Sequence, residues 1–311
     1  MKYPIFWSVL LLGLLGACQS PSSQSEPTEM VSGRYALNGI DQYVHIEGQG
    51  TPILIVHGGP GLDHSYIQPH LGKLADGFQL IYLDQRASGK SAIGPAQQIT
   101  VAQLVSDMEA LRDTLGIDQW HVLGHSWGGF LGLQYAAAHP NAVESLILMN
   151  SLGVSTADKQ QETASLGNRE TAEDSAETAK ILQSAEMQSR SPRAFEQLFE
   201  VSFRKEFFRR ELADSLHIHL SDSFVMQQRA MLQGLGPELQ EYDFSEMAAE
   251  LQVPTLLIYG DHDPLMEISG PKLAELIPEN EFVVLSECGH FPFIERPDTL
   301  MEVISAWADR E

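Results

Sequence analysis

Short apolar runs, each closed by a turn, are the feature that most restricts the fold of this chain. Residues 53–56 read Ile-Leu-Ile-Val, residues 80–83 read Leu-Ile-Tyr-Leu, and residues 146–149 read Leu-Ile-Leu-Met. Residues 255–259 form a further run, Thr-Leu-Leu-Ile-Tyr. Runs of this length without polar alternation are typical of strands buried on both faces, as in a parallel sheet.

Segments with helical periodicity alternate with these runs. Apolar residues at 101, 104, 105, 108, 111 and 115 form one face of a helix, for which Thr100 is a suitable N-cap. We also expect helices over 64–76, 127–138, 271–277 and 297–308, strands at 121–123 and 282–285, and an edge hairpin around 43–46. Strands that alternate with helices predict an α/β fold with a mainly parallel sheet and helices on both faces.

Residues 155–245 interrupt this alternation. They are rich in Glu, Gln, Ala, Ser and Arg and contain no convincing buried strand. We therefore expect a helical cap, inserted between two core strands, which divides the core into residues 31–154 and 246–311. The basic pairs Arg204-Lys205 and Arg209-Arg210 are interpreted as the solvated face of a cap helix.

The N-terminus resembles a bacterial lipoprotein signal. A basic start at Lys2 precedes an apolar stretch, which ends in Leu15-Gly16-Ala17-Cys18. The resemblance implies that residues 1–17 are removed and that Cys18 carries lipid, with residues 18–30 as a flexible Pro/Ser-rich tether. A plain signal peptide with an incidental cysteine is the alternative.

The lipoprotein signal implies a place in the cell as well. Its acylated Cys18 would anchor the chain to a lipid bilayer of the cell envelope. Gln19 occupies the position where an Asp would signal retention in the inner membrane of enterobacteria. In a Gram-negative host we therefore expect the periplasmic face of the outer membrane.

Charge and length exclude several classes of protein. The 311 residues include 42 acidic and 19 basic side chains, so the formal net charge is −23. A surface this negative repels phosphate backbones, and we expect no nucleic-acid partner. The length suits one large domain or two small ones, and nothing in the sequence sets the oligomeric state.

A serine lies where a strand meets a helix. Residues 124–128, Gly-His-Ser-Trp-Gly, fit G-x-S-x-G directly after the predicted strand 121–123 and directly before the predicted helix 127–138. This context places Ser126 on a tight turn at a helix N-terminus, where developing negative charge is stabilised. Ser126 is thus a candidate nucleophile.

A serine hydroxyl needs a base, and the base needs an orienting carboxylate. Asp263 follows the strand 255–259, and His290 follows the strand 282–285. Both loops emerge at the carboxyl ends of parallel strands, where ligands bind in such folds. Asp261 is a rival orienting carboxylate, and His125 and His262 are rival histidines.

A glycine-rich loop supplies a candidate oxyanion hole. His57-Gly58-Gly59-Pro60-Gly61 follows the strand 53–56, and the backbone N–H groups of Gly59 and Trp127 are suitable donors for a developing oxyanion. The loop lacks the Lys-Ser/Thr of a phosphate-binding loop. No metal-ligand cluster is evident in the sequence, and we expect neither a metal nor a cofactor.

Together these segments resemble the α/β-hydrolase superfamily, and within it the proline iminopeptidase group, over about residues 33–308. The loop 57–61 matches the HGGPG motif of that group. Residues 84–91 resemble its DQRGxGxS segment with Ala87 at a glycine position, and residues 124–129 resemble its GGSWGG elbow with His125 in place of glycine. The resemblance implies Ser126 as nucleophile, His290 as base, Asp263 as its orienting group, and Gly59 and Trp127 as oxyanion donors.

The sequence also departs from this group. Its members hold the free α-amine of the substrate with glutamates, and in one branch a Glu follows the catalytic Asp, where this chain has Pro264. Glu238, in a weakly similar Gly-Pro-Glu segment, is our candidate for the amine, with Glu196, Glu200 and Glu267 as others.

Three hypotheses follow for the function. The first is an aminopeptidase that acts on a small-molecule or short-peptide substrate. The second is a carboxylesterase or other small-ester hydrolase, and the third is a non-catalytic ligand-binding protein of the same fold.

Overall fold

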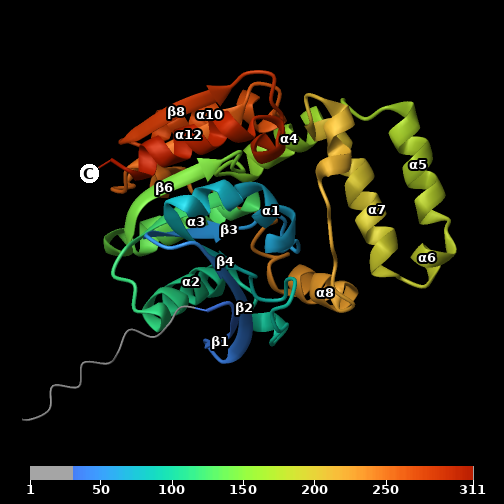
Figure 1. Cartoon of the computed structure of the whole chain (residues 1–311). Helices are drawn as coiled ribbons and strands as arrows, with labels where there is room; N and C mark the ends of the chain where they lie inside the picture. The colour runs from blue at the N-terminus through green and yellow to red at the C-terminus, as the bar shows by residue number, and fades with distance from the viewer. Residues whose placement is uncertain (1–30, 311) are drawn as a thin grey trace, which may run out of the picture.

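The computed structural model describes residues 31–310 and is shown in Figure 1. The expected signal segment 1–17, Cys18 and the tether up to residue 30 lie outside the described residues. Within the part that the structure describes, no helix combines the length and the hydrophobicity needed to cross a membrane.

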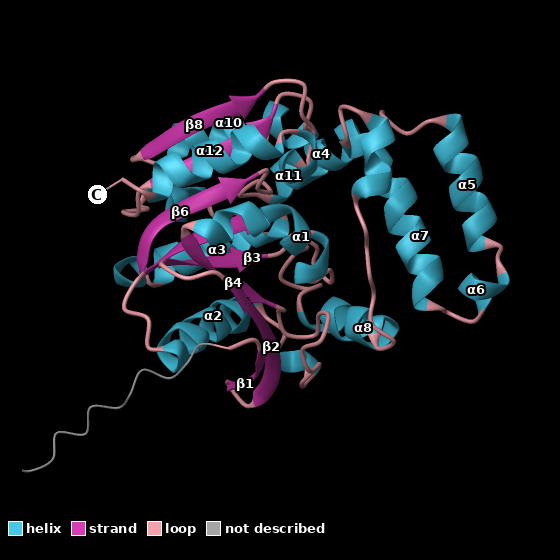
Figure 2. Cartoon of the chain, in the orientation of Figure 1, coloured by secondary structure: helices cyan, strands magenta, loops and turns pink. Residues whose placement is uncertain are grey.

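An eight-stranded sheet forms the centre of the molecule (Figure 2). Its strand order is β1-β2-β4-β3-β5-β6-β7-β8; β2 is antiparallel to β1 and β4, and the remaining neighbours are parallel. The predicted α/β architecture and the hairpin at the sheet edge are therefore confirmed. The strands are β1 Gly33–Leu37, β2 Ile40–Glu47, β3 Thr51–Val56, β4 Phe78–Leu83, β5 Trp120–His125, β6 Val143–Met149, β7 Thr255–Gly260 and β8 Asn280–Leu285.

The central strands are apolar throughout because both faces of the sheet are covered. In β3, Leu54 and Val56 belong to the core layer under α2 and α3, whereas Ile53 and Ile55 belong to the layer under α1 and α12. The core helices are α1 Gln68–Leu71, α2 Val101–Leu115, α3 Trp127–Ala138, α9 Ser245–Ala249, α10 Ser269–Leu276, α11 Pro292–Glu295 and α12 Pro297–Ala308.

The predicted helix α2 and its N-cap are confirmed. Thr100 is its N-cap and accepts a hydrogen bond from the N–H of Gln103 at 3.1 Å, and Gly116 ends the helix with φ of 67°. The single helix expected over 64–76 is wrong. The chain forms three short pieces there, 64–66, 68–71 and 72–76, because Pro69 has no N–H with which to continue a helix from residue 64.

A helical insertion lies between β6 and β7, as expected. Figure 1 shows α5, α6 and α7 standing beside the sheet, with α8 below them. Ser155 and Asp243 form a β-bridge, so the two ends of the insertion lie together. Its helices are α4 Thr156–Gly167, α5 Ala172–Leu182, α6 Ala185–Gln188, α7 Pro192–Phe203 and α8 Phe224–Gly234, with the 3-10 turns η5 Arg204–Glu206 and η6 Arg210–Ser215.

Candidate active site

Ser126 occupies a strained turn between β5 and α3. Its backbone has φ of 56° and ψ of −119°, a conformation that costs a side-chain-bearing residue about 1–3 kcal/mol. The flanking glycines permit the turn: a Cβ on Gly124 would lie 2.2 Å from the Gly128 carbonyl oxygen, and one on Gly128 would lie 2.0 Å from the Val56 oxygen. Any side chain at either position would disrupt the turn that presents Ser126.

His290 and Asp263 form a buried pair. His290 Nδ1 donates to Asp263 Oδ2 over 2.8 Å, and the Asp263 carboxylate also accepts from the Leu265 N–H at 3.0 Å and from the Asn150 side-chain amide. Asp261 instead accepts from the Cys288 N–H at 3.2 Å. The structure therefore favours Asp263 over Asp261 as the residue that orients His290.

These residues meet in one small cavity of about 230 Å³. Ser126, Asp263, His290 and Gly59 all contribute to its wall, whereas the rival His262 does not. The remaining wall is mostly apolar and comes from both the core and the cap: Gly58, Pro60, Leu62, Tyr66, His125, Leu152, Leu166, Phe199, Phe203, Glu206, Leu265 and Phe291.

The loop before Gly59 is held in one orientation. His57 Nε2 accepts from the Gln85 N–H at 3.1 Å, so the ring proton sits on Nδ1, which donates to the Gly58 carbonyl at 2.8 Å. The Gly58–Gly59 peptide is trans, so the Gly59 N–H points away from that carbonyl. His57 thus orients the candidate oxyanion donor.

Trp127 is the first residue of α3, so its N–H has no acceptor within the helix. This N–H lies next to Ser126 in the chain, at the helix end that favours negative charge. The indole is buried and donates to the Gln85 side chain at 2.9 Å. The backbone N–H of Trp127 is thereby available for a second hydrogen bond to an oxyanion.

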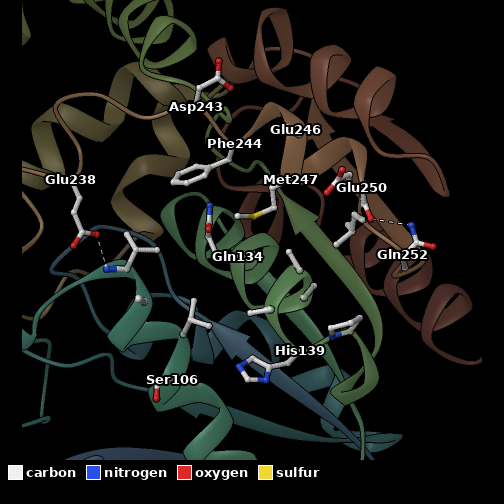
Figure 3. Close-up of a pocket in the computed structure, with 18 residues that line it drawn as sticks. Ser106, Gln134, His139, Glu238, Asp243, Phe244, Glu246, Met247, Glu250 and Gln252 are labelled. Carbon is white, nitrogen blue, oxygen red and sulfur yellow. Dashed lines mark hydrogen bonds between the residues drawn. The ribbon is translucent and has the colours of Figure 1, made fainter.

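The structure does not bring Glu238 to this cavity, and that expectation is corrected. Figure 3 shows Glu238 at another pocket, of about 1050 Å³, whose lining contains none of the catalytic candidates. Its carboxylate accepts from the Val101 N–H at 3.0 Å, a donor in the first turn of α2 that has no acceptor within the helix. Ion pairs also occupy the other candidates outside the cavity: Glu196 and Glu200 pair with Arg193, and Glu267 pairs with Arg169.

Glu206 is the carboxylate that the sequence interpretation missed. It ends η5 in the cap, and its Oε2 lies 3.9 Å from His290 Nε2. Burial raises the pKa of Glu206 to about 7, against the opposing charge of His290. The signal available in the sequence was the aromatic residues on both sides of this acidic residue, Phe203 and Phe207-Phe208. A fully solvated helix face would not carry aromatic residues at these positions.

The carboxylates also control the charge of His290. Burial opposes its protonation, but Asp263 and then Glu206 outweigh burial and raise the pKa of His290 to about 9. Imidazole acts as a base only when it is neutral. The neutral fraction of His290 therefore increases as pH rises toward and past this value.

We expect kcat/KM for a simple ester to rise with pH along a limb set by His290, above neutrality. Glu206→Gln removes a negative charge that favours the imidazolium, so this limb should move to lower pH. Initial rates at constant ionic strength from pH 6 to 10 measure both. A limb that stays in place in Glu206→Gln would contradict this electrostatic role.

A group of potential metal ligands is occupied by its own hydrogen bonds. Asp63, His64 and Asp84 come within ligand distance of one another among residues 31–310. His64 Nδ1 lies 2.6 Å from Asp84 Oδ1, and the Lys90 N–H donates to Asp84 Oδ2 at 2.9 Å. These bonds hold the loops after β3 and β4 together.

The family model for the alpha/beta hydrolase fold matches residues 51–297, and the chain belongs to this family. With its elbow serine and buried His–Asp pair, it is a serine hydrolase of that fold. The proline iminopeptidase of Lactobacillus delbrueckii subsp. bulgaricus is 28% identical, over 85% of this chain and 93% of the relative. That of Lactobacillus crispatus (strain ST1) is 27% identical, over 91% and 99% respectively.

Solved structures share the fold. The crystal structure of VinJ superposes with a TM-score of 0.70 at 21% identity and covers 91% of this chain and 99% of its own. The proline iminopeptidase of Mycobacterium smegmatis superposes with a TM-score of 0.66 at 23% identity, over 89% and 97%. At these identities the likeness establishes the architecture alone.

Proposed function

We propose that this serine hydrolase is an aminopeptidase that releases a small N-terminal residue, such as proline, from a short peptide or amide. The observation that carries the proposal is Glu206, a carboxylate only 13% exposed, in the cavity that holds Ser126 and His290. The similarity to proline iminopeptidases over most of the chain supports it.

The proposed reaction proceeds through an acyl-enzyme. Ser126 Oγ attacks the carbonyl carbon while His290 Nε2 takes its proton, and Asp263 stabilises the resulting imidazolium through Nδ1. The N–H groups of Gly59 and Trp127 bind the developing oxyanion. His290 then gives the proton to the leaving amine and later activates the water that releases the acid.

Glu206 has the position that amine recognition requires. The α-amine of a peptide lies two bonds from the carbonyl carbon that is attacked, so its partner must lie close to the catalytic groups. Glu206 is 3.9 Å from His290, and apolar walls such as Leu166 and Phe203 surround it. A protonated amine brought into such a site needs a carboxylate, because an unpaired buried cation costs several kcal/mol.

We expect Glu206→Gln to lower kcat/KM for Pro-linked chromogenic amides by about 10–100-fold, equivalent to about 1.4–2.8 kcal/mol. An acetyl ester carries no ammonium group and should lose less than about threefold when each enzyme is assayed at its own optimal pH. Parallel assays of the two substrates in wild type and variant measure the difference.

Glu238→Gln is the matched control, because its carboxylate lies at the start of α2 rather than in the cavity. This variant should leave kcat/KM for both substrates unchanged. Equal losses on amide and ester in Glu206→Gln would assign Glu206 to the support of His290 instead. A wild type that cleaves esters but no free-amine substrate would make the protein an esterase, the alternative that Pro264 in place of Glu leaves open.

We further propose that Cys18 is acylated and anchors the mature chain to the cell envelope, on the outer membrane in a Gram-negative host. The support is the sequence Leu15-Gly16-Ala17-Cys18 after an apolar stretch. We expect wild type to incorporate a clickable fatty acid and Cys18→Ala to accumulate as uncleaved precursor. Normal processing of Cys18→Ala, with no label in wild type, would indicate an ordinary signal peptide.

A further inference from the structure

Three buried hydrogen bonds form a network that connects the oxyanion loop, residues 57–61, to the catalytic histidine His290. The Gly58 N–H donates to Tyr66 Oη at 2.7 Å, Tyr66 Oη lies 2.7 Å from His125 Nδ1, and His125 Nε2 lies 2.9 Å from the His290 carbonyl oxygen. Neither Tyr66 nor His125 has a role in the reaction described above.

The protons in this hydrogen-bond network have one arrangement. A carbonyl oxygen only accepts, so His125 Nε2 must carry a proton and donate to His290. Burial and the neighbouring His290 hold the pKa of His125 well below its usual value, so the ring is neutral and Nδ1 accepts. Burial also raises the pKa of Tyr66, which keeps its proton and donates to Nδ1.

Both ends of the hydrogen-bond network lie at groups that the reaction needs. At one end, Gly58 directly precedes Gly59, the candidate oxyanion donor, and a Cβ on Gly58 would lie 2.8 Å from Tyr66 Oη. At the other end, His125 holds the carbonyl of His290, while the His290 N–H donates to the Glu206 carbonyl at 2.9 Å. The backbone of the base is therefore held from the core and from the cap.

We propose that Tyr66 and His125 are positioning residues that couple the oxyanion loop to His290, so that the two halves of the catalytic site hold their geometry together. The neutral state of His125 also favours catalysis at His290. Its ring centroid is 4.8 Å from that of His290, and a positive charge there would oppose the imidazolium that forms during catalysis.

The test uses Tyr66→Phe, His125→Gln and the double variant, assayed with an acetyl ester. The proposal rests on the triad assignment but not on the aminopeptidase proposal, because an ester needs no amine site. Glutamine can place an amide N–H near the Nε2 position and keep the bond to His290, but it offers Tyr66 no acceptor at the Nδ1 position. The variant therefore breaks the hydrogen-bond network at Tyr66 while the hydrogen bond to the His290 carbonyl remains.

We expect each single variant to lower kcat by about 10–100-fold with KM within about twofold, because oxyanion donors act in the transition state. The kcat of the double variant should be no more than about threefold below that of the worse single variant, since one broken hydrogen bond already uncouples the oxyanion loop from His290. Affinity for a phenylboronic acid, whose tetrahedral adduct places an oxygen in the oxyanion hole, should fall in parallel with kcat.

Tyr82→Phe is the control for the loss of a buried tyrosine hydrogen bond, because Tyr82 donates to Glu47 outside the cavity. It should reduce thermal stability like Tyr66→Phe and leave kcat unchanged. Losses that multiply in the double variant, or a His125→Gln enzyme with wild-type kcat, would overturn the coupling. If Tyr66→Phe does not fold, kcat and boronic-acid affinity of His125→Gln alone decide.

Discussion

Ser126→Ala should reduce kcat by about 10³-fold or more, because the other members of a catalytic triad contribute little without the nucleophile. Folding should be nearly unaffected. Ser126 sits in the turn with φ of 56° through its backbone, and its N–H donates to the Met149 carbonyl at 3.0 Å, a bond that alanine keeps. Steady-state rates with a chromogenic acetyl ester, together with thermal unfolding, measure both effects.

Labelling with a fluorophosphonate gives an independent readout of the same serine. Wild type should be modified once, at Ser126, and Ser126→Ala should not be modified. Ser106→Ala, on the exposed side of α2, is the control for a serine outside the catalytic cavity. Near-normal ester turnover by Ser126→Ala would show that the proposed mechanism is wrong.

Asp263→Asn should be almost as damaging, with kcat lower by about 10³–10⁴-fold. The carboxylate now accepts from His290 Nδ1 at 2.8 Å, which leaves Nε2 free to take the serine proton. An asparagine that turns its amide N–H toward Nδ1 would favour the opposite tautomer, with the proton on Nε2. It would also remove the negative charge that stabilises the imidazolium.

Asp261→Asn is the matched control, two residues away. Asp261 is exposed and, among residues 31–310, accepts a backbone N–H from Cys288 and no side-chain hydrogen bond. Its replacement should leave kcat within about threefold of wild type. If instead Asp261→Asn abolished activity and Asp263→Asn did not, the assignment of the orienting carboxylate would be reversed.

The sequence by itself determined the architecture and the position of each catalytic loop. A strand buried on both faces must be apolar at every position, so the run at 53–56 identified β3 without further information. The same holds for the elbow, because G-x-S-x-G between a strand and a helix is readable along the chain. Thr100 was likewise identified as the N-cap of α2, because its partner, the Gln103 N–H, is nearby in the chain.

Tertiary structure decided what depends on contacts between distant segments. Asp261 and Asp263 are equivalent along the chain, and only packing shows that Asp263 meets His290. Glu238 was attractive because of its neighbours in sequence, yet its partner is the Val101 N–H, 137 residues away. Glu206, in a segment that reads as a solvated helix, lies in the cavity beside His290.

The difference has one physical reason. Helix caps, strand burial and the elbow turn are specified by residues near one another in the chain, so a local pattern is enough to predict them. The place of a carboxylate, and the pKa that its surroundings impose, depend on which segments pack around it. In this protein the surroundings of Glu206 come from both the cap and the core, including His290, and long-range packing brings them together.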